Sequence, residues 1–131
     1  MASWNEKEKD EIEYRIKFIK QFLDLWTRYD GLFQTAYHEQ KADAESDEEF
    51  LKLKSQCARR HQYLMEYLGV EYKGAEQITP YLSDTVTLKA MIGIHVDFYK
   101  KLSLQWHHTF LRLHEAMGYL RTRLELEAAL D

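Results

Sequence analysis

The sequence predicts an all-α fold, an elongated up-down-up bundle of three long helices that is completed by dimerisation. Hydrophobic residues make up 45% of the chain and charged residues 31%, whereas only five residues are glycine and one is proline. This composition is typical of long helices, because glycine and proline are the residues that most often interrupt them. Residues 80–126 also carry apolar residues at the spacing of a helix face. The length predicts a single domain, residues 1–131.

The first helix is expected to begin at Ser3, because Glu6 follows three residues later and completes a capping box. Gly31 costs a helix about 1 kcal/mol relative to alanine, so we expect the helix to continue through it, straight or slightly bent. The apolar residues form two adjacent stripes that together cover about 200° of the helix surface, enough to contact two neighbours. These residues are Ile12, Ile16, Phe18, Ile19, Phe22, Leu23, Leu25, Trp26, Tyr29, Leu32, Phe33, Ala36 and Tyr37.

A turn is predicted within residues 39–49, which are acidic and contain no apolar residue larger than alanine. Ser46 and Glu49 form a second capping box, so the second helix is expected to start there and to end at Gly69. Residues 70–79 are then expected to be a loop. The apolar face of the second helix carries Phe50, Leu53, Cys57, His61, Leu64 and Leu68.

A third helix is predicted over residues 80–126 and would be about 70 Å long. Thr79 followed by Pro80 suits its start, and Ser83 or Asp84 is the alternative N-cap. All the residues of its apolar stripe lie within about 40° of one line. They are Leu88, Ile92, His95, Tyr99, Leu102, Trp106, Phe110, Leu113, Met117, Leu120 and Leu124.

These helix lengths do not match. Folding the second helix back about Ala44 places Leu68 beside Gln21, so the third helix would extend beyond the first from about Ser103 onward. An apolar overhang needs cover, and a homodimer in which each chain covers the other's overhang supplies it. The alternative is a four-helix monomer in which the third helix breaks near Ser103. The predicted dimer interface consists of Trp106, Phe110, Leu113, Met117, Leu120, Leu124, Ile12, Ile16 and Phe18.

Cys57 and His61 are the candidates for a metal or redox site, because they lie four residues apart on the apolar face of the second helix. The predicted folding brings Asp30 to about their level, with His95 one to two turns away. Such a set could bind zinc or activate a thiol, so a metal-binding or redox bundle is the first alternative function. A buried cysteine and a His–Asp pair that fixes helix register explain the same residues without a metal. We therefore expect no cofactor, with zinc at these four residues as the alternative.

Several function classes have no support in the sequence. It contains no phosphate-binding loop, nucleophile motif or HExxH motif, so no catalytic residue is assigned and an enzyme is not indicated. The net charge of −4 argues against nucleic acid as a partner. A nucleic-acid-binding accessory protein is the second alternative, in which Arg112, Arg121 and Arg123 converge across a dimer and contact phosphates. Uncharged stretches are too short to span a membrane, and a single cysteine with a charged N-terminus predicts a cytoplasmic protein.

Leu104 and Leu111 lie one heptad apart on the third helix, off its main stripe, with His107 and His114 beside them. This patch is the candidate contact for a helical protein partner. Together with the predicted homodimer, it indicates a non-catalytic scaffold or protein–protein interaction module. Such a module would self-associate through long apolar helix faces, as coiled coils do.

Overall fold

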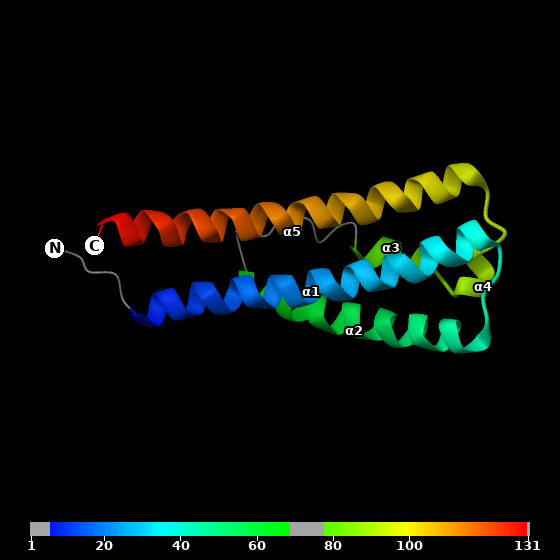
Figure 1. Cartoon of the computed structure of the whole chain (residues 1–131), viewed down its shortest axis with the longest axis horizontal. Coiled ribbons are helices and arrows are strands. Elements are labelled where there is room, and N and C mark those ends of the chain that lie inside the picture. Colours follow the sequence, from blue (N-terminus) through cyan, green and yellow to red (C-terminus); the bar gives the residue numbers. More distant parts are fainter. Residues whose placement is uncertain (1–5, 69–77, 131) are drawn as a thin grey trace.

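A computed structural model of the chain describes residues 6–68 and 78–130, with side chains up to residue 126, and these residues form an all-α bundle (Figure 1). The prediction of an elongated bundle with three long helices is confirmed. Two short helices lie between the second and third long helices in the sequence. The helices are α1 (Glu6–Glu39), α2 (Ala44–Leu68), α3 (Ile78–Asp84), α4 (Leu88–Met91) and α5 (Val96–Leu130).

The helix α1 is central and contacts α2 along one side and α5 along another, as the wide apolar surface predicts (Figure 1). Both neighbours run antiparallel to α1. Tyr29 stacks on Phe50 near the start of α2, and Phe18 contacts Tyr63 near its end. The third long helix α5 therefore runs parallel to α2, because α3 and α4 carry the chain back before α5 begins. The order of directions is up-down-down, not up-down-up.

The turn between α1 and α2 is closed by residues that the sequence did not single out. Gln40 adopts a left-handed backbone conformation with φ of 56°, and the Lys41 amide donates to the Ala36 carbonyl at 3.3 Å. This is a Schellman cap at the end of α1. The side chain of Asp43 then accepts a hydrogen bond from the Ser46 amide at 2.7 Å. Asp43, and not Ser46, therefore caps α2, and that prediction is wrong.

The register between α1 and α2 also differs from the prediction. Tyr67 contacts Tyr14, with ring centroids 5.9 Å apart, whereas the predicted fold placed this end of α2 near Gln21. The difference is about two helical turns. It arises because the turn is centred near residue 41 and not at Ala44. The Ser3 cap and the loop over residues 70–77 lie outside the described residues, and Gly31 lies within a continuous helix as expected.

The predicted continuous helix over residues 80–126 is wrong, because the chain leaves the helix twice between Asp84 and Val96. The hydroxyl of Thr85 donates to the Tyr81 carbonyl at 2.8 Å and closes α3. Thr87 has an extended backbone, and its side chain accepts from the Ala90 amide at 3.0 Å, so it caps α4. Threonine favours such caps over helix interiors because its hydroxyl competes for backbone partners.

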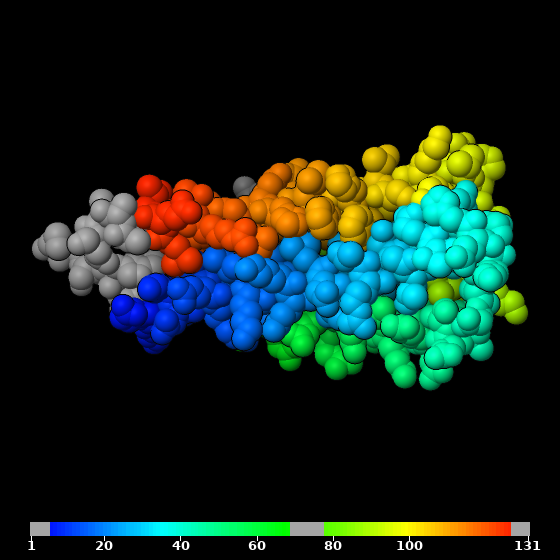
Figure 2. All heavy atoms as spheres, viewed as in Figure 1, coloured from blue at the N-terminus to red at the C-terminus, as the bar shows by residue number. Residues whose placement is uncertain are grey.

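The second interruption lies at residues 92–95, around Gly93, and ends where α5 begins. The ring nitrogen Nδ1 of His95 accepts a hydrogen bond from the Asp97 amide at 3.1 Å, so His95 caps α5 and is not part of an apolar stripe. From Val96 onward α5 is continuous, and the alternative break near Ser103 does not occur. Because α5 starts beside the end of α1, it packs antiparallel along α1 (Figure 2).

The predicted overhang of the third helix is consequently wrong. Six of the nine predicted interface residues are buried within the single chain, and Trp106, Phe110 and Leu124 are half-buried and pack against the same core. This packing removes the reason for which dimerisation was predicted. The six buried residues are Ile12, Ile16, Phe18, Leu113, Met117 and Leu120.

A pair of tryptophans fixes the register between α1 and α5. The indole rings of Trp26 and Trp106 stack with centroids 6.3 Å apart and an angle of 6° between their planes. The Trp26 indole donates to the Trp106 carbonyl at 3.2 Å, and the Trp106 indole donates to the Trp26 carbonyl at 2.9 Å. A slip along the helix would break both hydrogen bonds and the stack, so the pair specifies one alignment.

Candidate functional site

The candidate site at Cys57 and His61 lies in the core. Both side chains are buried on the inner face of α2, as their positions on the apolar stripe predict. Burial raises the pKa of the Cys57 thiol to about 12 and lowers the pKa of His61 to about 4. At neutral pH the pair is therefore a neutral thiol and a neutral imidazole, which is the environment of a structural cysteine and not of a reactive one.

The other two members of the predicted metal set do not join this pair. Asp30 accepts hydrogen bonds from Tyr81 at 3.1 Å and from Gln34 at 3.3 Å. His95 is exposed at the start of α5, where its ring nitrogen Nδ1 lies 3.6 Å from the carboxylate oxygen Oδ2 of Asp97. Within residues 6–68 and 78–126, no three His, Cys, Asp or Glu side chains are arranged to hold a metal ion. The predicted four-residue zinc set is therefore not assembled.

A chain of polar side chains that the sequence reasoning missed runs along α1 at positions 30, 34 and 38. Gln34 donates to Asp30 and accepts from the Tyr99 hydroxyl of α5. The Tyr99 hydroxyl is also 3.1 Å from the ring nitrogen Nε2 of His38. The spacing of four residues on α1 was visible in the sequence, but the tyrosines that complete the chain come from α3 and α5.

The hydrogen bonds to Asp30 stabilise its carboxylate in a partly buried position. Burial raises the pKa of the Asp30 carboxyl, and the hydrogen bonds from Gln34 and Tyr81 act in the opposite direction. Burial also raises the pKa of the Tyr81 hydroxyl well above its usual value, so Tyr81 stays a donor. Nearby, the hydroxyl of Tyr29 is 2.6 Å from that of Thr85. The polar groups join α1 to α3 and α5, which is a structural role.

The most distinctive exposed surface lies on α5. Four large apolar residues on its outer side remain exposed in the single chain, and we call this set the α5 stripe. At 100° per residue the four positions lie within about 80° of one another, and they extend over about 33 Å of helix. The α5 stripe consists of Leu104 (71% exposed), Leu111 (47%), Tyr119 (57%) and Leu126 (61%).

The predicted partner contact overlaps this stripe, because Leu104 and Leu111 belong to both. Leu104, His107, Leu111 and His114 are all exposed, so the structure leaves the predicted patch accessible. The rings of His107 and His114 flank the half-buried Phe110, at centroid distances of 5.9 and 4.4 Å. The outer face of α5 thus combines leucines with a column of rings, which is a surface suited to another helix.

The arginines that were candidates for phosphate contacts all lie on α5. Arg112 pairs with Glu115 on the same helix, with a nitrogen to oxygen distance of 3.0 Å. Arg121 is exposed and Arg123 is half-buried near the end of α5. Arg112 thus has an anionic partner on its own helix, and the convergence of the three arginines across a dimer stays a prediction.

None of the helices over residues 6–68 and 78–130 is both long and apolar enough to cross a bilayer.

Comparison of the chain with protein-family models, with curated proteins and with solved structures finds no match.

Proposed function

We propose that this chain is a non-catalytic protein–protein interaction module that self-associates through the α5 stripe. The observation that carries the proposal is the exposure of Leu104, Leu111, Tyr119 and Leu126 along one side of a 35-residue helix. Scattered apolar residues are common on protein surfaces, but a row at helical spacing is the arrangement that a second helix covers. The proposed contact surface is the outer side of α5 and replaces the overhang as the basis for a dimer.

The spacing of the α5 stripe is compatible with a two-fold antiparallel pair of α5 helices. If Glu115 lies at the centre, Leu104 faces Leu126 of the second copy and Leu111 faces Tyr119. A two-fold pair repeats each contact twice, so all four apolar residues are covered in one register. The two Glu115 side chains would meet at the centre. Each has an Arg112 at 3.0 Å in its own chain, which limits their repulsion.

The charges at the ends of α5 also favour this direction of pairing. Lys100 and Lys101 are exposed near its beginning, and Glu125 is exposed near its end. In the antiparallel register Lys101 lies about one helical turn from Glu125 of the second copy, whereas parallel pairing would bring the lysines of the two copies together. Opposite charges at such flanking positions set orientation more than affinity.

Sedimentation equilibrium over a range of micromolar concentrations tests the proposal. The wild-type chain is expected to approach the mass of two chains as its concentration rises. The double variant Leu104→Asn, Leu111→Asn should weaken association by about a thousandfold, since the two-fold pair loses four leucines at about 1 kcal/mol of buried apolar contact each. Both side chains are exposed in the single chain, so the variant should keep its helical circular dichroism.

The matched control is the double variant Leu51→Asn, Met65→Asn, which removes two exposed apolar residues from α2. It should associate as the wild type does. A wild-type chain that stays monomeric at the highest concentration would contradict the proposal. Equal weakening by the two double variants would also contradict it, because the contact would then not be specific to α5.

A further inference from the structure

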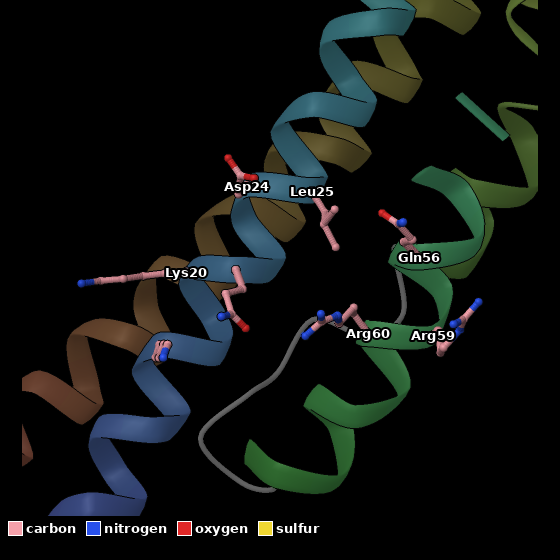
Figure 3. A pocket seen from close by; sticks show the side chains of 8 residues that line it. Lys20, Asp24, Leu25, Gln56, Arg59 and Arg60 are labelled. Atoms are coloured by element: carbon pink, nitrogen blue, oxygen red, sulfur yellow. The ribbon is translucent and has the colours of Figure 1, made fainter. Parts of the chain in front are cut away.

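A groove between α1 and α2 concentrates positive charge in a chain whose net charge is −4 (Figure 3). Its lining includes Lys17 and Lys20 from α1 and Arg59 and Arg60 from α2, against one carboxylate, that of Asp24. We call this the α1–α2 groove. It encloses about 640 Å³, which lies within the range of ligand-binding clefts. Acidic side chains elsewhere account for the negative total.

The single carboxylate at the groove has a cationic neighbour of its own. Arg28 lies 3.9 Å from Asp24 and 3.9 Å from Glu49, so the Asp24 carboxylate is paired with an arginine outside the groove lining. Figure 3 shows Arg60 and Gln56 pointing from α2 into the gap, whereas Lys20 on α1 and Arg59 on α2 point away from it into solvent. Because both lysines and both arginines are exposed, their flexible side chains can reach a bound anion without rearrangement of the helices.

Aromatic rings lie next to the groove, near the beginning of α1 and the end of α2. Tyr14, Tyr63 and Tyr67, which we call the tyrosine patch, are each about half exposed. Their rings surround the buried Phe18 at centroid distances of 6.3, 6.4 and 5.8 Å, respectively. The guanidinium of Arg60 lies over the Phe18 ring, 5.6 Å from its centroid, and so joins the cationic groove to the tyrosine patch. Cations and half-exposed aromatic rings are therefore adjacent.

We infer that the α1–α2 groove binds single-stranded nucleic acid, with the lysines and arginines contacting phosphates and the tyrosine patch stacking on bases. A positively charged groove beside aromatic side chains is the combination that recognises unpaired strands, because each nucleotide carries one phosphate and one planar base. A flat anionic membrane does not enter a concave groove, and an acidic peptide gains nothing specific from three tyrosines. This inference concerns a surface of α1 and α2 and is independent of self-association through α5.

Fluorescence anisotropy of the full chain with a fluorescein-labelled oligo(dT) of about 12 nucleotides tests the inference. Binding should weaken steeply as salt rises, with a logarithmic slope that falls by about 0.7 for each phosphate contact removed. The double variant Lys17→Gln, Lys20→Gln should lower both the affinity and this slope. Tyr63→Leu, which keeps an apolar cover over Phe18, should lower the affinity about fivefold or more with an unchanged slope.

The matched control is Lys41→Gln, Lys89→Gln, which changes the net charge by the same amount at exposed positions outside both the groove and α5. It should bind as the wild type does. Equal loss in the two lysine variants, or no binding by the wild type at about 50 mM salt, would overturn the inference. So would tighter binding to vesicles of phosphatidylserine or to polyglutamate than to the oligonucleotide, with the same dependence on Lys17 and Lys20.

Discussion

At the scale of single residues, burial determines the chemistry of the titratable groups. Cys57 and His61 look like ligands in the sequence, but both are held neutral because the helix packs their face against α1. The ring of His61 lies against Phe22 with centroids 6.0 Å apart, which makes it part of the aromatic core. Desolvation disfavours the Cys57 thiolate that metal binding or redox chemistry would use, and it keeps the His61 imidazole neutral.

His61 should make the stability of the protein depend on pH. Its pKa is about 4 in the folded chain and near 6.5 when unfolded, so the unfolded chain binds more protons between these values. Stability should therefore fall as pH decreases from about 6.5 to about 4, by up to about 3 kcal/mol. The raised pKa of Asp30 acts in the opposite direction, because that carboxyl binds a proton more readily when folded.

Urea unfolding at several pH values, compared between the wild type and His61→Leu, isolates the histidine contribution. The contribution of Asp30 is common to both proteins and cancels in the difference. Between pH 6.5 and pH 4, the free energy of unfolding of the wild type should fall by up to about 3 kcal/mol more than that of the variant. Parallel profiles would contradict this, because they would show that His61 binds a proton as readily in the folded chain as in the unfolded one.

At the scale of helices, local capping chemistry decided where elements begin and end. Three side chains each accept a hydrogen bond from a backbone amide in the first turn of a helix: those of Thr87, Asp43 and His95. The Leu88 amide also donates to Asp47 of α2 at 2.9 Å, so α2 helps to fix the start of α4. The break between α3 and α4 was therefore partly visible in the sequence, as two threonines flanking Val86, and partly dependent on a residue far along the chain.

Gly31 should be a site at which the protein can be stabilised. It lies inside α1, and a Cβ atom added there meets nothing within 4 Å. Gly31→Ala should therefore stabilise the fold by about 1 kcal/mol and raise the melting temperature by about 4 °C. The reverse change at an exposed position of α2, Ala58→Gly, should destabilise by about the same amount. Thermal unfolding followed by circular dichroism measures both, and a loss of stability in Gly31→Ala would show that the glycine has a packing role.

At the scale of the whole molecule, the return of the chain through α3 and α4 determines which apolar surface is covered. Both short helices contact α2. The helix α3 also contacts α5 and so lies between the two parallel long helices, whereas α4 packs against α1. This path brings the start of α5 beside the end of α1. The apolar face of α5 is then covered by its own chain, and the outer α5 stripe stays exposed.

Leu113 and Leu111 provide a direct test of this arrangement. Leu113 is fully buried within the single chain, whereas Leu111 is 47% exposed. Leu113→Ala should destabilise the monomer by about 2–5 kcal/mol, and Leu111→Ala should change its stability by less than about 1 kcal/mol. Urea unfolding, at a protein concentration low enough to keep the chain monomeric, measures the stability of both variants. Similar small effects would mean that the inner face of α5 is not packed against α1.

The sequence by itself determined the helical class, the central position of α1 and the buried face of α2, because these follow from the spacing of apolar residues within each segment. It also marked the outer leucines of α5 as apolar positions distinct from the main stripe and as a candidate contact surface. Periodicity reports only which side of a helix is apolar. It says nothing about which neighbour covers that side.

Only the tertiary structure decided the pairing. The Trp26–Trp106 hydrogen bonds, the link from Tyr99 to Gln34, and the turn that Asp47 helps to hold all join residues distant in sequence. A shift of about two turns between α1 and α2, together with the return through α3, replaced an overhang with a covered core. Register between helices depends on these long-range contacts, because several registers would bury similar apolar stripes and only specific side-chain pairs separate them.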